Sequence, residues 1–172
     1  MGYEFEVMPA DIDEKAIRFD DPTKLTLALA DAKAEAILSK LPSGKILITS
    51  DQVVLCGGKI REKPENESEA EEFLKSYMFL PAETVTAVVV SNTTTRKRAG
   101  GVDIAKIWIK PLPESVISEY ISSGDAALHS GEFDHEHPIL KPYIDRIEGD
   151  PDSVTGLPGG LTKRLIEEVS NE

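Results

Sequence analysis

The hydrophobic and polar positions along the chain form one pronounced apolar run that stops at a carboxylate. Residues 46–49 are apolar or β-branched, Ser50-Asp51-Gln52 follows, and apolar residues resume at Val53. This pattern predicts a buried strand that brings Asp51 to its end, where the loops of α/β proteins bind ligands. The alternative for a single Asp after a strand is that it only begins a turn or caps a neighbouring element.

Two helices carry clear start signals in the sequence. Asp21 before Pro22 places a capping side chain ahead of a proline in the first helical position, and the apolar positions that follow predict a helix to about Ser39. Ser68 with Glu71 three residues later is a capping-box pattern that opens a second helix. The other helices that we expect after the first cover residues 68–78, 115–122 and 161–169.

The predicted strands suggest an α/β fold. Tyr3 to Met8 alternates apolar residues with glutamates, which predicts a half-buried strand. The other expected strands cover residues 59–64, 83–91 and 103–110. The order of elements argues for one α/β unit with a mixed sheet, either as one domain or as two lobes that share a core. A chain of 172 residues is long enough to bury such a core.

The composition narrows the partners and the compartment. Acidic residues exceed basic ones, 31 to 19, and the net charge of −12 argues against a general nucleic-acid-binding surface. Cys56 is the single cysteine, so it allows no intramolecular disulfide and no zinc cluster, and a reducing interior is expected. No apolar run approaches the roughly 20 residues that span a membrane, and no secretory signal follows Met1. We therefore expect a cytoplasmic protein.

Several charged residues are candidates for cation and phosphate binding. The acidic features are the turn Asp11-Asp13-Glu14, the strand residue Asp51, and the set Glu132, Asp134 and Glu136. Magnesium takes few protein carboxylates and bridges to substrate phosphates, so two of these features brought together would suffice. For an acidic cluster taken alone, a solvated turn is the plainer interpretation. Lys33 and Lys63 could bind phosphate, although an exposed lysine is more often only a surface residue.

In their order along the chain, several segments resemble the Maf family of nucleoside triphosphate pyrophosphatases. The matching segments are Phe5-Glu6-Val7, Ile12-Asp13-Glu14, Ala30-Asp31-Ala32-Lys33-Ala34, Thr49-Ser50-Asp51-Gln52-Val53-Val54 and Glu62-Lys63-Pro64, with the stretches 120–125, 147–150 and 154–158. Each segment is a weak signal alone, but together they span nearly the whole chain. The resemblance implies a curved α/β sheet flanked by helices, as in inosine triphosphatases, in two lobes with a nucleotide cleft.

The resemblance also implies a metal-dependent hydrolase and a role for each candidate residue. Such an enzyme cleaves the α–β phosphoanhydride of a nucleoside triphosphate and releases the monophosphate and pyrophosphate. Asp51 would be the general base or metal-linked carboxylate that activates water, and Glu14 would help to hold Mg²⁺ or Mn²⁺. Lys33 and Lys63 would neutralise the phosphates. Gln52, next to the general base Asp51, would bind the nucleotide. An Asp at its ordinary pKa is already ionised at neutral pH and needs only placement.

The segment 130–138 lies where the family's substrate choice is set. It reads Ser-Gly-Glu-Phe-Asp-His-Glu-His-Pro and lacks the Tyr-Gly-Ile-Gln-Gly run of the branch that prefers thymidine and uridine triphosphates. Gly131, Phe133 and Glu136 instead match the branch associated with 7-methylguanosine triphosphate. A carboxylate at Glu136 could accept the N1 and N2 donors of guanine. The resemblance thus implies a methylated or otherwise non-standard nucleoside triphosphate as substrate.

The chain departs from the family at its start. Family members begin with a strand and a loop rich in Ser and Arg, whose hydroxyl and guanidinium groups contact the triphosphate. This sequence starts at Met1-Gly2-Tyr3, so we expect a single Maf-like domain over residues 1–172, N-terminally truncated relative to the family. We also expect an exposed sheet edge that favours a homodimer. The alternative to the enzyme is a non-catalytic nucleotide-binding or interaction protein that kept the scaffold and lost the phosphate loop.

Overall fold

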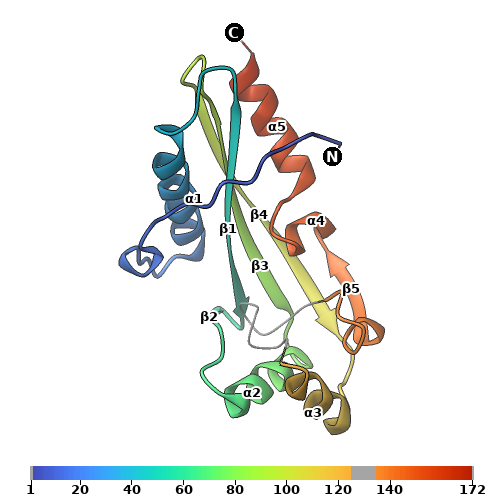
Figure 1. Cartoon of the computed structure of the whole chain (residues 1–172). Coiled ribbons are helices and arrows are strands. Elements are labelled where there is room, and N and C mark those ends of the chain that lie inside the picture. The colour runs from blue at the N-terminus through green and yellow to red at the C-terminus, as the bar shows by residue number, and fades with distance from the viewer. Residues whose placement is uncertain (1, 125–134, 172) are drawn as a thin grey trace. The chain divides into compact units, whose positions relative to one another are not determined.

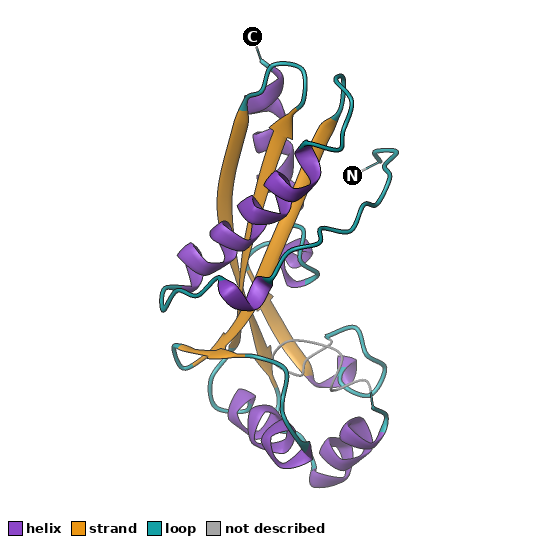
Figure 2. Cartoon of the chain, turned by 60° about the vertical axis from the view of Figure 1, so that its left-hand side comes forward, coloured by secondary structure: helices purple, strands orange, loops and turns teal. Residues whose placement is uncertain are grey.

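The computed structural model of the chain describes residues 2–124 and 135–171 (Figures 1 and 2). Its strands are β1 (Ile46–Cys56), β2 (Lys59–Arg61), β3 (Ala82–Asn92), β4 (Arg98–Ile109) and β5 (Ile144–Glu148). Its α-helices are α1 (Pro22–Leu38), α2 (Glu67–Tyr77), α3 (Glu114–Ser122), α4 (Pro151–Val154) and α5 (Gly159–Ser170), joined by the 3-10 helices η1 (Glu14–Ala16) and η4 (Lys141–Tyr143). Among the described residues, no helix is both long and apolar enough to cross a membrane. The α/β class is confirmed.

The sheet has the strand order β2-β1-β3-β4-β5, and its pairings are antiparallel. We expected a mixed sheet, and the correction comes from the connections, because tight turns reverse the chain after β1 and after β3. Gly57 and Gly58 form the first turn with φ of +58° and +76°, a conformation that suits a two-residue hairpin. In the second turn the backbone N–H of Asn92 donates to the Lys97 carbonyl at 2.9 Å. Parallel neighbours would need a longer crossover connection.

The chain divides into two compact units. The first contains residues 1–52, 85–103 and 150–172, and the second contains residues 53–84 and 104–149. Strands β1, β3 and β4 each pass from one unit into the other. Each unit therefore builds its core from one part of these strands and from the helices that pack on that part.

In the first unit, one face of β3 packs against α1. Ala87 and Val89 of β3 form a cluster with Ala30 and Ala34 of α1, and both helix residues are fully buried. These small side chains on the contact surfaces allow the helix to approach the strand closely. This packing fixes the position of the helix that carries Lys33, one of the candidate site residues.

The other face of β3 packs against α5, which Figure 1 shows on the opposite side of the strands from α1. Val88 and Val90 are fully buried there against Leu161, Leu165 and Val169 of α5. Because successive side chains of a strand point to opposite faces, a strand buried on both faces is apolar throughout. The run of valines in β3 is therefore explained by its central position between two helices.

In the second unit, α2 and α3 pack against each other. Tyr120 of α3 is fully buried. The Arg61 guanidinium of β2 lies over the Phe73 ring of α2, 4.3 Å from its centre, in a cation–π contact. Cys56, the last residue of β1, is 3% exposed, and its Sγ lies 3.5 Å from Ser76 Oγ of α2.

The segment from Tyr3 to Met8 is not the half-buried strand that its alternation predicts. It forms no regular structure, and Figure 2 draws it as loop. Phe5 and Val7 are 81% and 84% exposed. Alternation produces a strand only where a neighbouring strand can share its backbone hydrogen bonds, and no described strand pairs with this segment.

The helix starts follow the sequence with one correction. Asp21 caps α1 as predicted, because its Oδ1 accepts hydrogen bonds from backbone N–H groups of the first turn. Helix α2 is capped by Asn66 rather than by Ser68, and the Asn66 side chain accepts from the Glu69 N–H at 3.0 Å. Asparagine is among the strongest N-cap residues, so the helix begins at the earlier signal. Helices α3 and α5 cover the segments expected to be helical near the C-terminal end of the sequence.

Candidate functional site

Asp51 lies in the middle of β1 rather than at the end of a strand, which corrects the expectation from its sequence. The strand continues to Cys56 because the residues after Gln52 are again apolar. Alternation along β1 sets Thr49 and Asp51 on the face toward α1. Thr49 Oγ1 donates to the Ala30 carbonyl of α1 at 2.8 Å, which ties this part of the strand to the helix. Asp51 therefore projects from a regular strand that is anchored beside it.

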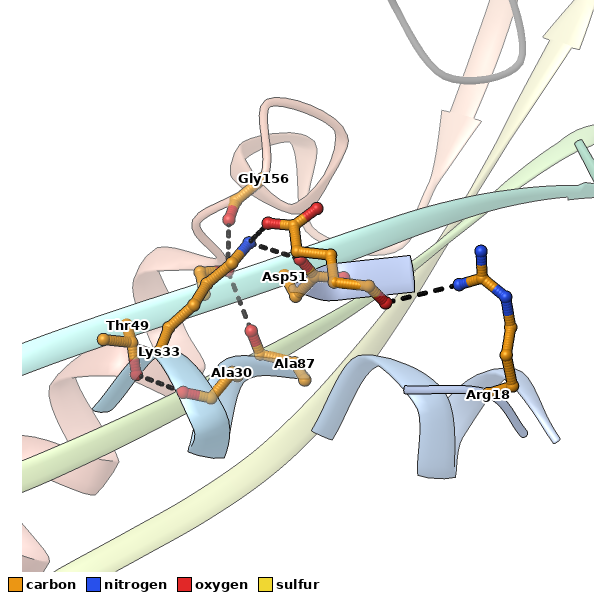
Figure 3. Close-up of polar contacts among 9 residues, drawn as sticks. Arg18, Ala30, Lys33, Thr49, Asp51, Ala87 and Gly156 are labelled. Atoms are coloured by element: carbon orange, nitrogen blue, oxygen red, sulfur yellow. Dashed lines mark hydrogen bonds and ion pairs between the residues drawn. The ribbon is translucent and has the colours of Figure 1, made fainter. Parts of the chain in front are cut away.

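Lys33, on the turn of α1 that follows Ala30, brings its ammonium group to two carboxylates (Figure 3). Its Nζ lies 2.5 Å from Asp51 Oδ1 and 3.0 Å from Glu14 Oε1. Three of the residues that we selected from the sequence are thus brought together from a 3-10 turn, a helix and a strand. Their catalytic, metal-binding and phosphate-binding roles stay predictions.

Glu14 is positioned by the turn that it opens. At the start of this turn, η1, Asp13 Oδ1 accepts a hydrogen bond from the Lys15 N–H at 3.1 Å. Arg18 Nη1 donates to the Glu14 carbonyl oxygen at 3.3 Å (Figure 3). The Glu14 side chain is 56% exposed, so a fixed backbone is combined with a carboxylate that solvent and ligands can reach.

The site holds two carboxylates and one ammonium group. Burial raises the pKa of Asp51, the Lys33 ammonium offsets this rise only in part, and the negative charge of Glu14 adds to it. Burial by itself would lower the pKa of Lys33, but hydrogen bonds to Asp51 and Glu14 outweigh it and the pKa is raised. Lys33 therefore stays protonated. Asp51 is a stronger base than the Asp with an ordinary pKa that we expected.

Gln52 lies on the opposite face of β1 from Asp51. Its Nε2 donates to Thr86 Oγ1 and to the Ser153 carbonyl, both at 2.6 Å. Thr86 and Ser153 are fully buried. Both hydrogens of the Gln52 amide are therefore used inside the fold, and this placement gives no support to the nucleotide-binding role predicted for Gln52.

Ser50 joins the same polar cluster, which the sequence analysis missed. Its Oγ lies 2.8 Å from the Ala87 carbonyl and 2.7 Å from the Gly156 carbonyl, and its single proton serves one of them at a time. A signal for this cluster was present in the sequence. Alternation around Asp51 puts both of its polar neighbours on one face of a buried strand, where polar groups require hydrogen-bond partners.

Two other predicted site residues lie in the second unit. Lys63 is exposed in the loop after β2, and Glu136 is exposed in a turn before η4. Both therefore belong to a different compact unit from Lys33 and Asp51. Positions 131 and 133, which together with Glu136 match the branch associated with 7-methylguanosine triphosphate, lie outside the described residues. The substrate-binding roles of Lys63 and Glu136 stay predictions.

Glu14 and Asp51 form a donor set that suits a hard divalent cation. Lys33 contacts one oxygen of each, Glu14 Oε1 and Asp51 Oδ1, so these ion pairs do not use the second oxygens. Mg²⁺ is usually bound by one or two carboxylates together with substrate phosphates. Within the part of the chain that the structure describes, no group of three or more His, Cys, Asp or Glu residues could hold a metal. The pair therefore fits a cation that completes its coordination with phosphate oxygens and water.

In sequence, the chain is similar to proteins named as nucleotide pyrophosphatases. The sequence model of a family described as Maf-like protein matches residues 1–169. A 7-methyl-GTP pyrophosphatase of Dictyostelium discoideum is 43% identical, over 99% of this chain and 89% of the relative. A dTTP/UTP pyrophosphatase of Vibrio vulnificus is 30% identical, over 98% of this chain and 89% of the relative. A nucleoside triphosphate pyrophosphatase of a Synechococcus strain is also 30% identical, over 96% of this chain and 83% of the relative.

Proposed function

Because this chain belongs to the Maf-like protein family, we propose that it is a nucleoside triphosphate pyrophosphatase. The reaction is hydrolysis of the α–β phosphoanhydride, which yields a nucleoside monophosphate and pyrophosphate. The observation that carries the proposal is the Lys33 ammonium group set between Asp51 and Glu14. Hydrolysis of a phosphoanhydride requires a positioned base and countercharge for the phosphates, and these residues supply both.

Asp51 would act as the general base toward the attacking water. Its side chain is 11% exposed, so it is shielded from solvent but can still be reached by a water molecule. Its position in the middle of β1 restricts its movement, which favours a productive orientation toward the water. Asp51 would then return the proton to solvent or to a product oxygen.

Glu14 and Asp51 would also hold a Mg²⁺ or Mn²⁺ ion. When bound, such an ion neutralises the charge of the triphosphate and of the pyrophosphate that leaves. Lys33, which projects from α1, would place its ammonium group beside the phosphates of the substrate. Lys63, exposed in the loop after β2, would add a second one.

A 7-methylated guanosine triphosphate is the substrate that we propose for this enzyme. The support is the relative named 7-methyl-GTP pyrophosphatase, at 43% identity against 30% for a relative named dTTP/UTP pyrophosphatase. Methylation at N7 gives the guanine ring a positive charge. Glu136 would accept hydrogen bonds from the N1 and N2 donors of that ring and would complement its charge.

The test of the activity is pyrophosphate release with Mg²⁺ over a panel of ordinary and methylated nucleoside triphosphates. Asp51→Asn should lower kcat by about 10²- to 10⁴-fold, because it removes the base but keeps the size of the side chain. Asp31→Asn is the matched control. Asp31 lies on the same helix as Lys33 and pairs with Arg98, so this variant should keep a rate close to that of the wild type.

The same panel tests the choice of base. Glu136→Gln should slow hydrolysis of both guanine nucleotides, and of the methylated one more because the charge complement is also lost, while nucleotides with other bases should be hydrolysed at an unchanged rate. Equal rates for wild type and Asp51→Asn would contradict the role of Asp51. A folded wild-type protein that binds nucleotides but releases no pyrophosphate would favour the non-catalytic nucleotide-binding protein instead.

A further inference from the structure

The ammonium group of Lys33 contacts both carboxylates that would hold the divalent cation. Nζ lies within hydrogen-bond distance of Asp51 Oδ1 and at 3.0 Å from Glu14 Oε1. The two carboxylates come from β1 and η1, and Lys33 is the one residue in these contacts that bridges them. A positive charge therefore already sits where the coordinating oxygens converge.

A free divalent cation would have to compete with this ammonium group. Lys33 and Asp51 side chains are 21% and 11% exposed, so water screens their charges less than at the surface. A cation bound to the same carboxylates would lie close to a second positive charge, and the repulsion would weaken its binding. Moving Lys33 away without a new partner would leave its ammonium group without the two contacts it makes here.

We propose that Lys33 holds the cation position in the free protein, and that the divalent cation binds together with the nucleotide, whose phosphates take over the ammonium group. This inference rests on the proposed function, because it assumes a triphosphate ligand. In the exchange, Lys33 gives up two carboxylates and gains phosphate oxygens, while the cation gains the carboxylates. No charge is left without a partner at either stage.

The local structure allows this exchange with a movement of the side chain alone. Ala30 and Ala34, on either side of Lys33 in sequence, are fully buried against β3, so the backbone of α1 is fixed at this point. A lysine side chain has a flexible four-carbon stem and three donors that can be redirected. Only the end of the side chain therefore needs to move from the carboxylates to a phosphate.

The proposal predicts a reciprocal coupling between cation and nucleotide. A nucleotide that removes Lys33 from the carboxylates should tighten cation binding, and a bound cation should tighten nucleotide binding by the same factor. A coupling of about 5- to 150-fold is typical of such linkage. Removing the ammonium group should strengthen binding of the cation alone and reduce the coupling.

The test is to measure the affinity for Mn²⁺ in the absence of nucleotide, by electron paramagnetic resonance and by calorimetry. Lys33→Met should bind Mn²⁺ about 5- to 150-fold more tightly than the wild type, and Lys33→Arg should bind as weakly as the wild type. Lys24→Met is the matched control. It removes one positive charge from an exposed position of the same helix and should leave Mn²⁺ binding unchanged.

Further variants connect the gain to the two carboxylates. Lys33→Met combined with Glu14→Gln should lose the gain, because one of the two ligands is removed. Addition of a non-hydrolysable α,β-methylene nucleoside triphosphate should increase the affinity for Mn²⁺ by a larger factor in the wild type than in Lys33→Met. Lys33→Gln is the second variant if Lys33→Met does not fold.

Equal affinity for Mn²⁺ alone of the wild type and of folded Lys33→Met, or of folded Lys33→Gln in its place, would overturn the proposal. A gain in Lys24→Met equal to that in Lys33→Met would also overturn it, because the effect would then follow net charge. These measurements need no turnover. If the protein releases no pyrophosphate but the Mn²⁺ affinities of the wild type and the variants differ as expected, the result would contradict the proposed enzyme and support the role of Lys33.

Discussion

At the scale of single residues, Asp51 is harder to ionise than an ordinary Asp. Burial disfavours its charged form, Glu14 adds to this effect, and Lys33 opposes it only in part. Residues at functional sites are often less stabilising than alternatives at the same position. Asp51 is therefore expected to lower the stability of the folded chain at neutral pH relative to an uncharged residue of the same size.

The pH dependence of unfolding should report this effect. A carboxyl group whose pKa is higher in the folded than in the unfolded state holds more protons when folded, so stability falls as pH rises between the two values. For Asp51 this window begins at the ordinary value of 3.8 and extends upward. The wild type should lose free energy of unfolding relative to Asp51→Asn as pH rises through this window. Urea denaturation of both proteins over a pH series checks it, and a constant difference would contradict the expectation.

Gln52 should matter for stability rather than for substrate affinity. Gln52→Leu removes the donor to Thr86 and Ser153 and should lower the free energy of unfolding by about 1–3 kcal/mol, because buried acceptors lose a partner. Thr49→Val removes one donor from the opposite face of β1 and should cost about 1 kcal/mol. Urea denaturation and KM measured side by side test this. A raised KM with unchanged stability in Gln52→Leu would instead support the predicted nucleotide-binding role.

At the scale of elements, the turn after β5 depends on a glycine. Gly149 has φ of +103°, and a Cβ there would lie 2.9 Å from the Ile104 carbonyl oxygen. Gly124 also has positive φ, +79°, but a Cβ there would meet nothing within 4 Å. A comparison of alanine substitutions at the two positions therefore distinguishes the cost of backbone strain from the cost of a steric clash with the neighbouring strand.

Gly149→Ala should therefore destabilise the chain more than Gly124→Ala. The strain of a left-handed backbone costs about 1–2 kcal/mol, which is the loss expected for Gly124→Ala. Gly149→Ala adds the contact with backbone atoms of β4 and should lose about 3 kcal/mol or more. Thermal and urea unfolding measure both. Equal losses would show that the strand at Ile104 moves aside.

The elements that the sequence predicted are those whose signals are local. The Asp21 cap lies next to the helix that it begins, and it was recognised from the sequence. The segment from Tyr3 to Met8 was misassigned because alternation shows which face is apolar but not whether a partner strand lies alongside. The end of β1 was placed too early, at Asp51, because a buried strand can contain a carboxylate when a lysine from another element pairs with it.

The candidate site was predicted in part, and by the family resemblance rather than by local signals. The family resemblance placed Glu14, Lys33 and Asp51 in one site, although they are separated along the chain. It gave no sign of the cluster around Gln52. Alternation indicates that Ser50 and Gln52 share a buried face, but it does not identify Ser153, 101 positions away, as the partner of Gln52.

At the scale of the whole molecule, the homodimer that we expected stays a prediction, and two features support it. Strand β2 pairs only with residues 54–56 of β1, so no described strand covers the outer edge of β1 before them. The apolar residues of the segment from Tyr3 to Met8 are exposed. An uncovered strand edge and an exposed alternating segment are complementary and favour pairing between copies.

Replacing an exposed residue of this segment should therefore weaken self-association. Phe5→Asp should lower the dimer fraction in sedimentation velocity at a given concentration. Phe79→Asp is the matched control, because Phe79 is 80% exposed against 81% for Phe5 and lies in the second unit. A wild type that is monomeric at all concentrations, or an equal effect of both variants, would contradict the expectation.

The single thiol at the end of β1 makes the opening of that strand measurable. Cys56 is 3% exposed, and it is the single cysteine of the chain, so a thiol reagent gives one signal without background. Its labelling rate depends on how often the strand end becomes accessible, either by local opening or by global unfolding. The dependence of that rate on denaturant distinguishes the two. The strand that carries Asp51 therefore contains a natural kinetic probe, which can show whether a bound nucleotide slows its opening.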